Sequence, residues 1–326
     1  MDEQFLQDRA YPYCKGIADA LVGLMEPDKN GKLKLPLSSS PEIHNNTQKA
    51  WLKPNSNFDL SLIRWLLGAN AEMATALGKK EEAARWKTLL GKMDELAVDG
   101  KGALLMAQGE PLKGSHRHFS HLMAIQPLGI ISTDGDARQA NIVKSSLDET
   151  LALGTKQWTG YSFSWMACLL ARAGDAERAE KYLNTYLESF ILRNGFHCNG
   201  EVTDKGWSQY RYQAFTLEGN FAAGQAVHEM LLQTWGHRIR IFPATPEAWA
   251  DVSFDTLRGE GGFIVSAVRS EGKTISVTVK ATVDGPLRLE DPFGGEPYTA
   301  NFSIKRSGDD LICQMKAGQM LELKSK

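Results

Sequence analysis

The chain has 326 residues, of which 42% are hydrophobic and 23% are charged, and these fractions are close to the average for folded proteins. They exclude disordered and fibrous proteins, and the length suits one large domain with a smaller one. The 37 basic and 39 acidic residues give a net charge of −2, and no Lys/Arg-rich block occurs, so we expect neither nucleic acid nor an anionic membrane as a partner.

The N-terminal sequence and the cysteines narrow the classes further. No apolar run reaches the roughly 18–20 residues that a membrane helix needs. The acidic residues 2–3 and the lack of a following hydrophobic run predict that this chain carries no signal peptide. The four cysteines, at 14, 168, 198 and 313, are too few and too scattered for a disulfide framework or a zinc knuckle. We therefore expect no metal ion and no cofactor.

Up to about residue 235 the apolar residues recur at helical spacing. The predicted helices are 3–25, 58–77, 80–97, 118–126, 136–153, 161–173, 176–192 and 216–234. Residues 77–86 and 173–182 share one pattern, in which a glycine ends a helix in the left-handed conformation and a polar or acidic turn starts the next. This pattern is typical of an antiparallel helix hairpin, and a ring of such hairpins is an (α/α) toroid.

From about residue 237 the pattern changes to short β-branched or alternating segments, separated by Gly and Asp-Gly turns. We therefore predict a helical (α/α)-barrel-type domain over 1–236 and a small antiparallel β domain over 237–326. Pro243 and Pro246 lie at the expected hinge between them.

Two polar segments of the helical part are candidates for chemistry. In the loop 37–46, Glu42 directly follows Pro41, which stiffens the backbone. It is either a solvated loop residue or a general acid on a rigid loop. In the second segment, His116, His118 and His121 lie within six residues. No carboxylate or cysteine stands at a spacing that would complete a zinc site, so these histidines either hydrogen-bond a helix entry or form a polar wall that donates to sugar hydroxyls.

Two further segments carry aromatic and acidic candidates. Trp158 and Trp165 flank a glycine-containing helix start, and we assign Trp165 to the core and Trp158 to stacking on a sugar ring. Glu218 and Asn220 flank Gly219 where the last long helix begins. Glu218 is either a charge that suits a helix N-terminus or a carboxylate that orients an amide or a water. Two carboxylates in unlike surroundings are what inverting glycoside hydrolysis needs.

Together these motifs resemble glycoside hydrolase family 95, the inverting α-L-fucosidases. Seven family motifs stand in the same order along this chain: Tyr-Pro at 11–12, Ser-Pro-Glu at 40–42, the histidine segment 116–122, Thr-Gly-x-Ser-x-x-Trp at 159–165 with the hairpin 174–179, the segment 215–222, the hinge 242–249 and Leu-Arg-x-x-Gly-Gly-Phe at 257–263. The resemblance therefore covers nearly the whole chain.

The resemblance implies an (α/α)6 barrel followed by a β domain, and a glycan with a terminal α-L-fucosyl or related L-galactosyl residue as substrate. It implies that Glu42 is the general acid, that Glu218 stands where the family has an Asp that polarises an Asn, and that the three histidines line the pocket. Since family members commonly act outside the cytoplasm, it also implies a periplasmic or extracellular location.

The chain departs from the family pattern in three ways. The segment 215–222 ends in Ala222 where the family has Gly, and Tyr212-Gln213-Ala214 replaces the family's Pro-Pro, which suggests a different pocket edge. Glu218 is one methylene longer than the family's Asp, and the family's water-activating Asn-x-Asn pair lies upstream of its Tyr-Pro segment and has no counterpart here. With about eight helices instead of twelve, we expect an incomplete toroid that a longer chain or a second chain completes, and near-zero activity of this chain alone. The alternatives are a non-catalytic carbohydrate-binding or scaffold remnant, and a helical-repeat interaction module. The unlike hairpin lengths and the β segment argue against the last.

Overall fold

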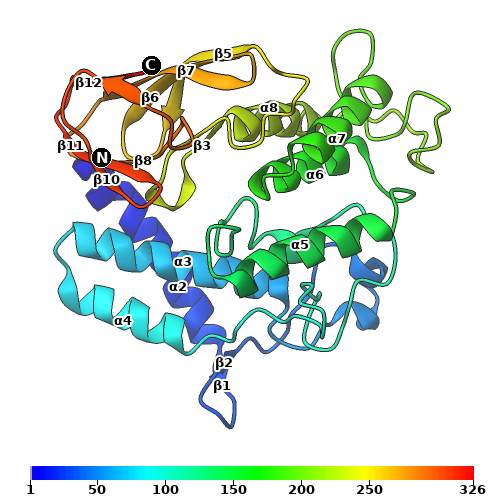
Figure 1. The fold of residues 1–326 in the computed structure, drawn as a ribbon. Helices are drawn as coiled ribbons and strands as arrows, with labels where there is room; N and C mark the ends of the chain where they lie inside the picture. Colours follow the sequence, from blue (N-terminus) through cyan, green and yellow to red (C-terminus); the bar gives the residue numbers. More distant parts are fainter. Residues whose placement is uncertain (1) are drawn as a thin grey trace. The chain divides into compact units, whose positions relative to one another are not determined.

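The computed structural model describes residues 2–326 and divides into two compact units, 2–158 and 159–326. The helices precede the large antiparallel sheets along the chain (Figure 1). This confirms the predicted class, a mostly helical part followed by a small antiparallel β part. Within residues 2–326 no helix combines the length and the apolar character needed to cross a membrane.

The unit 2–158 contains helices, one small β-hairpin and long irregular loops. Its segments are α1 (Glu3–Phe5), η1 (Leu6–Ala10), α2 (Tyr11–Leu24), β1 (Glu26–Pro27), β2 (Leu33–Lys34), η2 (Ile43–Asn46), η3 (Gln48–Ala50), α3 (Asn57–Ala76), α4 (Lys80–Gly91), η4 (Ser120–Leu122) and α5 (Ala137–Ala152). Helices α3 and α4 lie side by side in Figure 1. The glycine between them, Gly78, has φ +70°, the left-handed cap that the sequence predicts.

The Tyr-Pro motif at 11–12 has a structural role in this unit. Tyr11 is buried with Leu60, Leu67 and Trp86 in the core that α2, α3 and α4 share. Its hydroxyl accepts a hydrogen bond from Trp86 Nε1 at 3.1 Å and donates one to Glu82 at 2.7 Å. A buried hydroxyl that both donates and accepts a hydrogen bond is fully satisfied. The Tyr11 ring can therefore hold α2 against the helix pair α3–α4.

Two helix predictions in this unit need correction. The predicted helix 3–25 is interrupted by the wider π-helical stretch η1, because Pro12 has no N–H to donate to the preceding turn. The predicted helix 118–126 is wrong: only η4 is helical, as a short 3-10 turn, and 123–128 continues as turns. Pro127 disfavours helical backbone in the residue before it, so this short segment cannot extend into a helix.

The unit 159–326 contains three helices and the β-sheets. Its segments are α6 (Gly160–Arg172), α7 (Ala176–Ser189), α8 (Glu218–Leu231), β3 (Leu232–Gln233), η5 (Trp235–His237), β4 (Arg240–Ile241), β5 (Val252–Gly259), β6 (Phe263–Ser270), β7 (Lys273–Ala281), β8 (Gly285–Glu290), β9 (Tyr298–Ala300), β10 (Lys305–Ser307), β11 (Asp310–Met315) and β12 (Met320–Ser325). Helix α6 packs against both α7 and α8. Gly174, between α6 and α7, has φ +74°, which confirms the second predicted hairpin.

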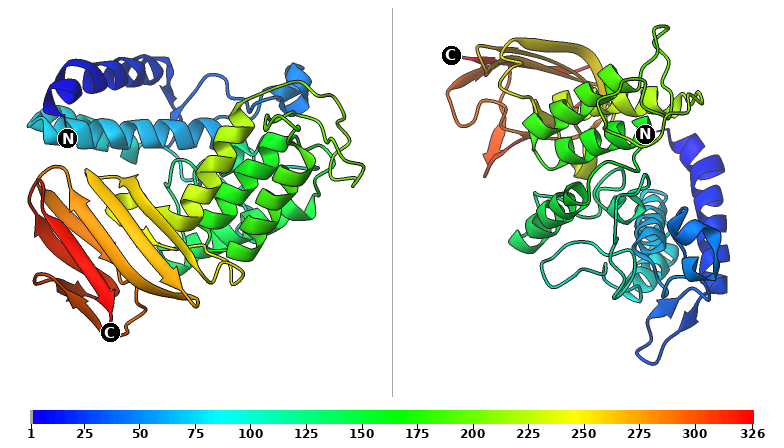
Figure 2. Two further views of the ribbon diagram at one scale, coloured as in Figure 1. Left: turned by 90° about the horizontal axis from the view of Figure 1, so that it is seen from above. Right: turned by 90° about the vertical axis from the view of Figure 1, so that its right-hand side faces the viewer.

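The strands of this unit form two main antiparallel sheets, seen in yellow to red in Figure 2. One has the order β5-β6-β7-β12-β9 and the other β10-β11-β8. Val265 and Leu321 of the first sheet share one buried core with Leu289 and Leu311 of the second. The alternation that the sequence shows from residue 237 onward therefore reflects one buried face on each of two packed sheets.

Several predicted features remain predictions. Seven helices of at least 12 residues occur within residues 2–326, against the predicted eight, because 118–126 is not helical. Helices α4, α7 and α8 end earlier than predicted. The compact units divide at 158/159. The incomplete toroid and the domain boundary at 236/237 stay predictions.

Candidate active site

The loop that carries Glu42 has an unusual backbone. Glu42, His44 and Asn45 all have φ between +51° and +56°, the left-handed region that costs a non-glycine residue roughly 1–2 kcal/mol. Such strain persists only where the surroundings hold the chain in place, and it is frequent at functional sites. The proline before Glu42 and the contacts described next supply that restraint.

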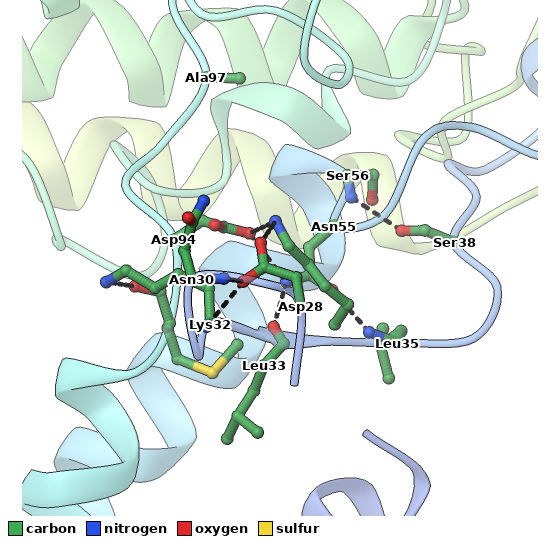
Figure 3. A network of polar contacts seen from close by, with 12 residues as sticks. Asp28, Asn30, Lys32, Leu33, Leu35, Ser38, Asn55, Ser56, Asp94 and Ala97 are labelled. Atoms are coloured by element: carbon green, nitrogen blue, oxygen red, sulfur yellow. Dashed lines mark hydrogen bonds and ion pairs between the residues drawn. The ribbon is translucent and has the colours of Figure 1, made fainter. Parts of the chain in front are cut away.

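The segment before Glu42 is anchored to the start of α3. Figure 3 shows Asn55 holding the chain on its way to the loop: its Oδ1 accepts from Leu35 N–H and its Nδ2 donates to Leu33 O, both at 3.0 Å. Ser38 Oγ accepts from Ser56 N–H at 2.8 Å and donates to the Asp59 carboxylate. The approach to Glu42 is therefore fixed by side chains that also begin a helix.

The other side of the loop is tied to the histidine segment. Ser40 Oγ and Ser120 Oγ, both buried, form a hydrogen bond. The Glu42 carboxylate forms an ion pair with the Arg117 guanidinium, and its Oε2 lies 3.0 Å from His118 Nε2. The Glu42 side chain is 44% exposed, so the carboxylate is reachable from solvent while two neighbours fix its direction.

The two histidines beside Glu42 are neutral at neutral pH. Burial, together with the nearby His116 and Arg117, lowers the pKa of His118 to about 4. Burial also lowers the pKa of His116, whose Nδ1 accepts from His118 N–H at 3.1 Å. With a neutral His118 ring and an ionised Glu42, the contact at Nε2 requires the tautomer that carries its proton there. His118 then donates to Glu42.

His121 lies away from this surface. It is 2% exposed, and the structure describes no hydrogen-bond partner for its Nδ1 within residues 2–326. Burial lowers its pKa to about 3. Among the described residues, no three metal-ligating side chains lie close enough together to hold a metal ion. Of the three predicted histidines, the structure brings two, His116 and His118, to Glu42.

Trp158 is also buried. Its indole is 1% exposed and packs edge-on against Phe119, with ring centroids 4.9 Å apart. In this conformation the ring has no face on which a sugar could stack, so the role assigned to Trp158 from the sequence has no support in the structure. The sequence shows an aromatic residue in a loop, but not what packs over it.

A cavity of about 350 Å³ opens beside Glu42 within the unit 2–158. Residues 42–45 and 109–117 line it. Leu52 and Met106 lie at its floor, and Gln157 also lines it. Its volume is at the lower end of the roughly 300–1,000 Å³ typical of small-molecule sites.

The second predicted site lies in the unit 159–326. Glu218 is the first residue of α8, and its side chain is exposed. The Asn220 side chain is used in the fold: Oδ1 accepts from His197 N–H at 2.8 Å, and Nδ2 donates to Gly195 O at 2.9 Å. This amide therefore ties the loop 193–197 to α8. The pairing of Glu218 with Glu42 across a substrate stays a prediction.

His197 is the residue of this region that the sequence did not reveal. Its buried ring lies against Gly160 and Gly219, which lie in the first turns of α6 and α8. Nδ1 lies 2.5 Å from Thr216 O, and the part of the chain that the structure describes offers Nε2 no partner. A Cβ at Gly219 would lie 2.5 Å from Nδ1. Two glycines at helix starts are the only sequence signal for this contact.

Comparisons with known proteins agree with the motif order. Residues 1–231 match the Glycosyl hydrolase family 95 catalytic domain. Alpha-L-fucosidase 2 of Arabidopsis thaliana is 26% identical over 289 residues, which are 84% of this chain and 33% of that protein. This chain thus spans about a third of the length of the curated relative it matches.

Two solved structures are similar at low sequence identity. An α-L-rhamnosidase from Dictyoglumus thermophilum has a TM-score of 0.44 at 11% identity, covering 82% of this chain and 32% of that one. An α-L-rhamnosidase from Aspergillus terreus has a TM-score of 0.37 at 11% identity, covering 81% of this chain and 29% of that one.

Proposed function

The chain belongs to glycoside hydrolase family 95, and we propose that it is the acid-bearing part of an inverting α-L-fucosidase-like hydrolase with Glu42 as its general acid. In this proposal the substrate is a glycan that ends in an α-L-fucosyl or a related L-galactosyl residue. The name of the Arabidopsis relative, Alpha-L-fucosidase 2, supports the fucosyl alternative. The observation that carries the proposal is the position of Glu42, held on a strained loop at the edge of a cavity with Arg117 and His118 beside it.

In this role Glu42 donates a proton to the glycosidic oxygen as the bond to the anomeric carbon breaks. The ion pair with Arg117 favours the ionised carboxyl, which has no proton to give. The guanidinium therefore has to turn away from Glu42 when substrate binds, and the substrate hydroxyls offer it other acceptors. His118, which stays neutral, remains beside the carboxyl in either state.

Inversion also requires a water activated on the opposite face of the sugar. We assign Glu218, the exposed first residue of α8, to orienting that water or its amide. The chain's own Asn-x-Asn triplet, 55–57, does not fit this task. Both amide groups of Asn57 and Asn55 bond backbone or side-chain groups of the fold.

The water-activating amide therefore comes, in this proposal, from a further segment or a second chain. We expect this chain alone to release sugar at a near-zero rate. Rapid turnover by the chain alone would contradict that expectation and would make Glu218, or another group of this chain, sufficient as the base.

The role of Glu42 is tested with substrates that differ in their need for an acid. The hydrolysis is measured in the presence of the segment or chain that supplies the water-activating amide. There, Glu42→Gln is expected to lower the hydrolysis rate of an α-L-fucosyl disaccharide by about 10²- to 10⁴-fold. It should lose far less with α-L-fucosyl fluoride, because fluoride leaves without protonation. Glu95→Gln is the matched control, since Glu95 is 76% exposed and does not line the cavity. Equal loss on both substrates, or none, would remove Glu42 from the role of acid.

A second candidate is carbohydrate binding without hydrolysis. It is favoured by the ion pair of Glu42 with Arg117 and by the engaged amide of Asn220. The outcome that distinguishes it is saturable binding of a fucosylated glycan, measured by calorimetry, with no release of free sugar even when the segment or chain that supplies the water-activating amide is present.

A further inference from the structure

The floor of the cavity beside Glu42 consists of buried apolar side chains. Ile43, Leu52, Met106 and Ala107 are buried together, and Leu112 packs against them. Three of these, Ile43, Leu52 and Met106, line the cavity along with Leu112. An apolar floor under a polar rim suits a pyranose ring, which has C–H groups on its faces and hydroxyls around its edge.

The rim of the cavity is charged but balanced. Glu42 and Glu110 are acidic, and Lys113 and Arg117 are basic, so their formal charges sum to zero. His116, which also lines the cavity, is neutral at neutral pH because burial lowers its pKa. A site without net charge discriminates against phosphorylated sugars and uronic acids and suits a neutral one.

Glu110 is fixed by the loop that carries it. Its backbone N–H donates to Ala107 O, and its carbonyl accepts from Met106 N–H, both at 2.9 Å. Its carboxylate accepts from Lys53 N–H at 3.3 Å. A carboxylate whose backbone is set in this way can accept hydrogen bonds from hydroxyls at little further entropic cost.

The cavity opens toward solvent along the loop 109–114. Gly109, Pro111, Lys113 and Gly114, which line it, are all exposed. A subsite for a terminal sugar can be closed at its far end, whereas a subsite for the leaving group has to let the remaining glycan pass outward. The position of Glu42 at the edge of the cavity places the proton donor next to the oxygen that departs with that group.

We propose that this cavity is the leaving-group subsite, that it takes a neutral pyranoside, and that Glu110 and Lys113 determine its specificity by binding hydroxyls of that sugar. The proposal rests on the glycosidase function inferred above. Its experiment is therefore a binding measurement that does not depend on turnover.

The probe is lactose, a neutral disaccharide, titrated into protein labelled with ¹³C at the methionine methyl groups. Met106 lies at the cavity floor, and the Met106→Leu variant identifies its signal among the ten methionines. We expect a saturable shift of the Met106 signal, and about tenfold weaker binding in both Glu110→Ala and Lys113→Ala, because each loses a charged hydrogen-bond partner. Glu95→Ala should bind as the wild type does.

Three results would overturn the proposal. The first is no shift with lactose, cellobiose or xylobiose up to the solubility of each sugar. The second is tighter binding of methyl β-D-glucuronide than of lactose, which would contradict the charge argument. The third is displacement of lactose by free L-fucose, which would make the cavity the subsite of the cleaved sugar.

The same measurement separates this proposal from the proposed function. Lactose binding that persists in Glu42→Gln, with no hydrolysis by the wild type even when the water-activating amide is supplied, would count against the glycosidase and leave the sugar site standing. Hydrolysis of a fucosylated disaccharide that is unchanged in Glu110→Ala and Lys113→Ala would support the glycosidase and overturn the site.

Discussion

The contact between His197 and Gly219 predicts how a substitution of Gly219 changes stability. Replacing Gly219 by alanine should lower stability while His197 is present and raise it when the His197 side chain is removed. Gly219 lies in the first turn of α8 with a backbone that an alanine can adopt. Alanine in a helix is favoured over glycine by roughly 0.5–1 kcal/mol. Its Cβ, however, would lie 2.5 Å from His197 Nδ1 and 2.6 Å from Cγ, far inside van der Waals contact.

Overpacking of this kind typically costs about 1–3 kcal/mol, which exceeds the helix gain. We therefore expect Gly219→Ala to lower the stability of the unit 159–326 by about 1–2 kcal/mol once the two effects are combined. In a His197→Ala background the obstacle is gone, so the same substitution should raise stability by roughly 0.5–1 kcal/mol.

The assay is thermal unfolding of the wild type, both single variants and the double variant, which form a double-mutant cycle. For a cooperative unit of 150–250 residues, each kcal/mol shifts the midpoint by about 2–4 °C. Gly224→Ala is the matched control in the same helix, since a Cβ there meets nothing within 4 Å. It should be neutral or stabilising in both backgrounds.

One result would refute the reasoning. If Gly219→Ala changes the midpoint by the same amount with and without the imidazole, the ring does not restrict the helix start. The glycine would then have to be explained by its place in the 218–220 motif alone.

Two further predictions concern buried ionisable groups. Burial lowers the pKa of His121 to about 3, below the 6.5 that is usual for histidine. The unfolded chain therefore binds a proton in that window while the folded one does not, and stability falls as the pH falls from about 6.5. His121→Phe should therefore lose less stability than the wild type between about pH 7 and about pH 4 in thermal unfolding; an identical loss would contradict this. The buried pair Arg172–Glu229, 2.6 Å apart, predicts that Glu229→Gln costs about 3–5 kcal/mol. The apolar double variant Arg172→Met/Glu229→Leu should recover most of this lost stability. If urea unfolding gives Glu229→Gln and the double variant the same free energy of unfolding, the pairing is contradicted.

The sequence predicted those features whose cause is local. The hairpins around Gly78 and Gly174 follow from apolar spacing and from a residue that tolerates positive φ, and both are present. The alternating strands after residue 237 were predictable for the same reason. The helix over 118–126 was predicted from spacing alone, and Pro127 decides against it.

The parts of the site that depend on distant contacts could not be predicted. Arg117 reaches Glu42 from 75 positions away, and nothing in either segment specifies that pairing. Trp158 looks like an available ring in the sequence, but Phe119 covers it. The buried ring of His197 explains two glycines at once, and only the fold shows that both meet the same side chain.

The attachment of the loop 37–46, which carries Glu42, to the start of α3 has a consequence at raised temperature. Ser56 caps α3 by accepting from Asp59 N–H at 3.1 Å, and the Asp59 carboxylate accepts from both Ser56 and Ser38. The first turn of a helix frays at lower temperature than its middle, and here that fraying would release the strained backbone at Glu42. The fixed position of the Glu42 carboxylate would then be lost at a lower temperature than the main unfolding transition, while tryptophan fluorescence still reports an intact core.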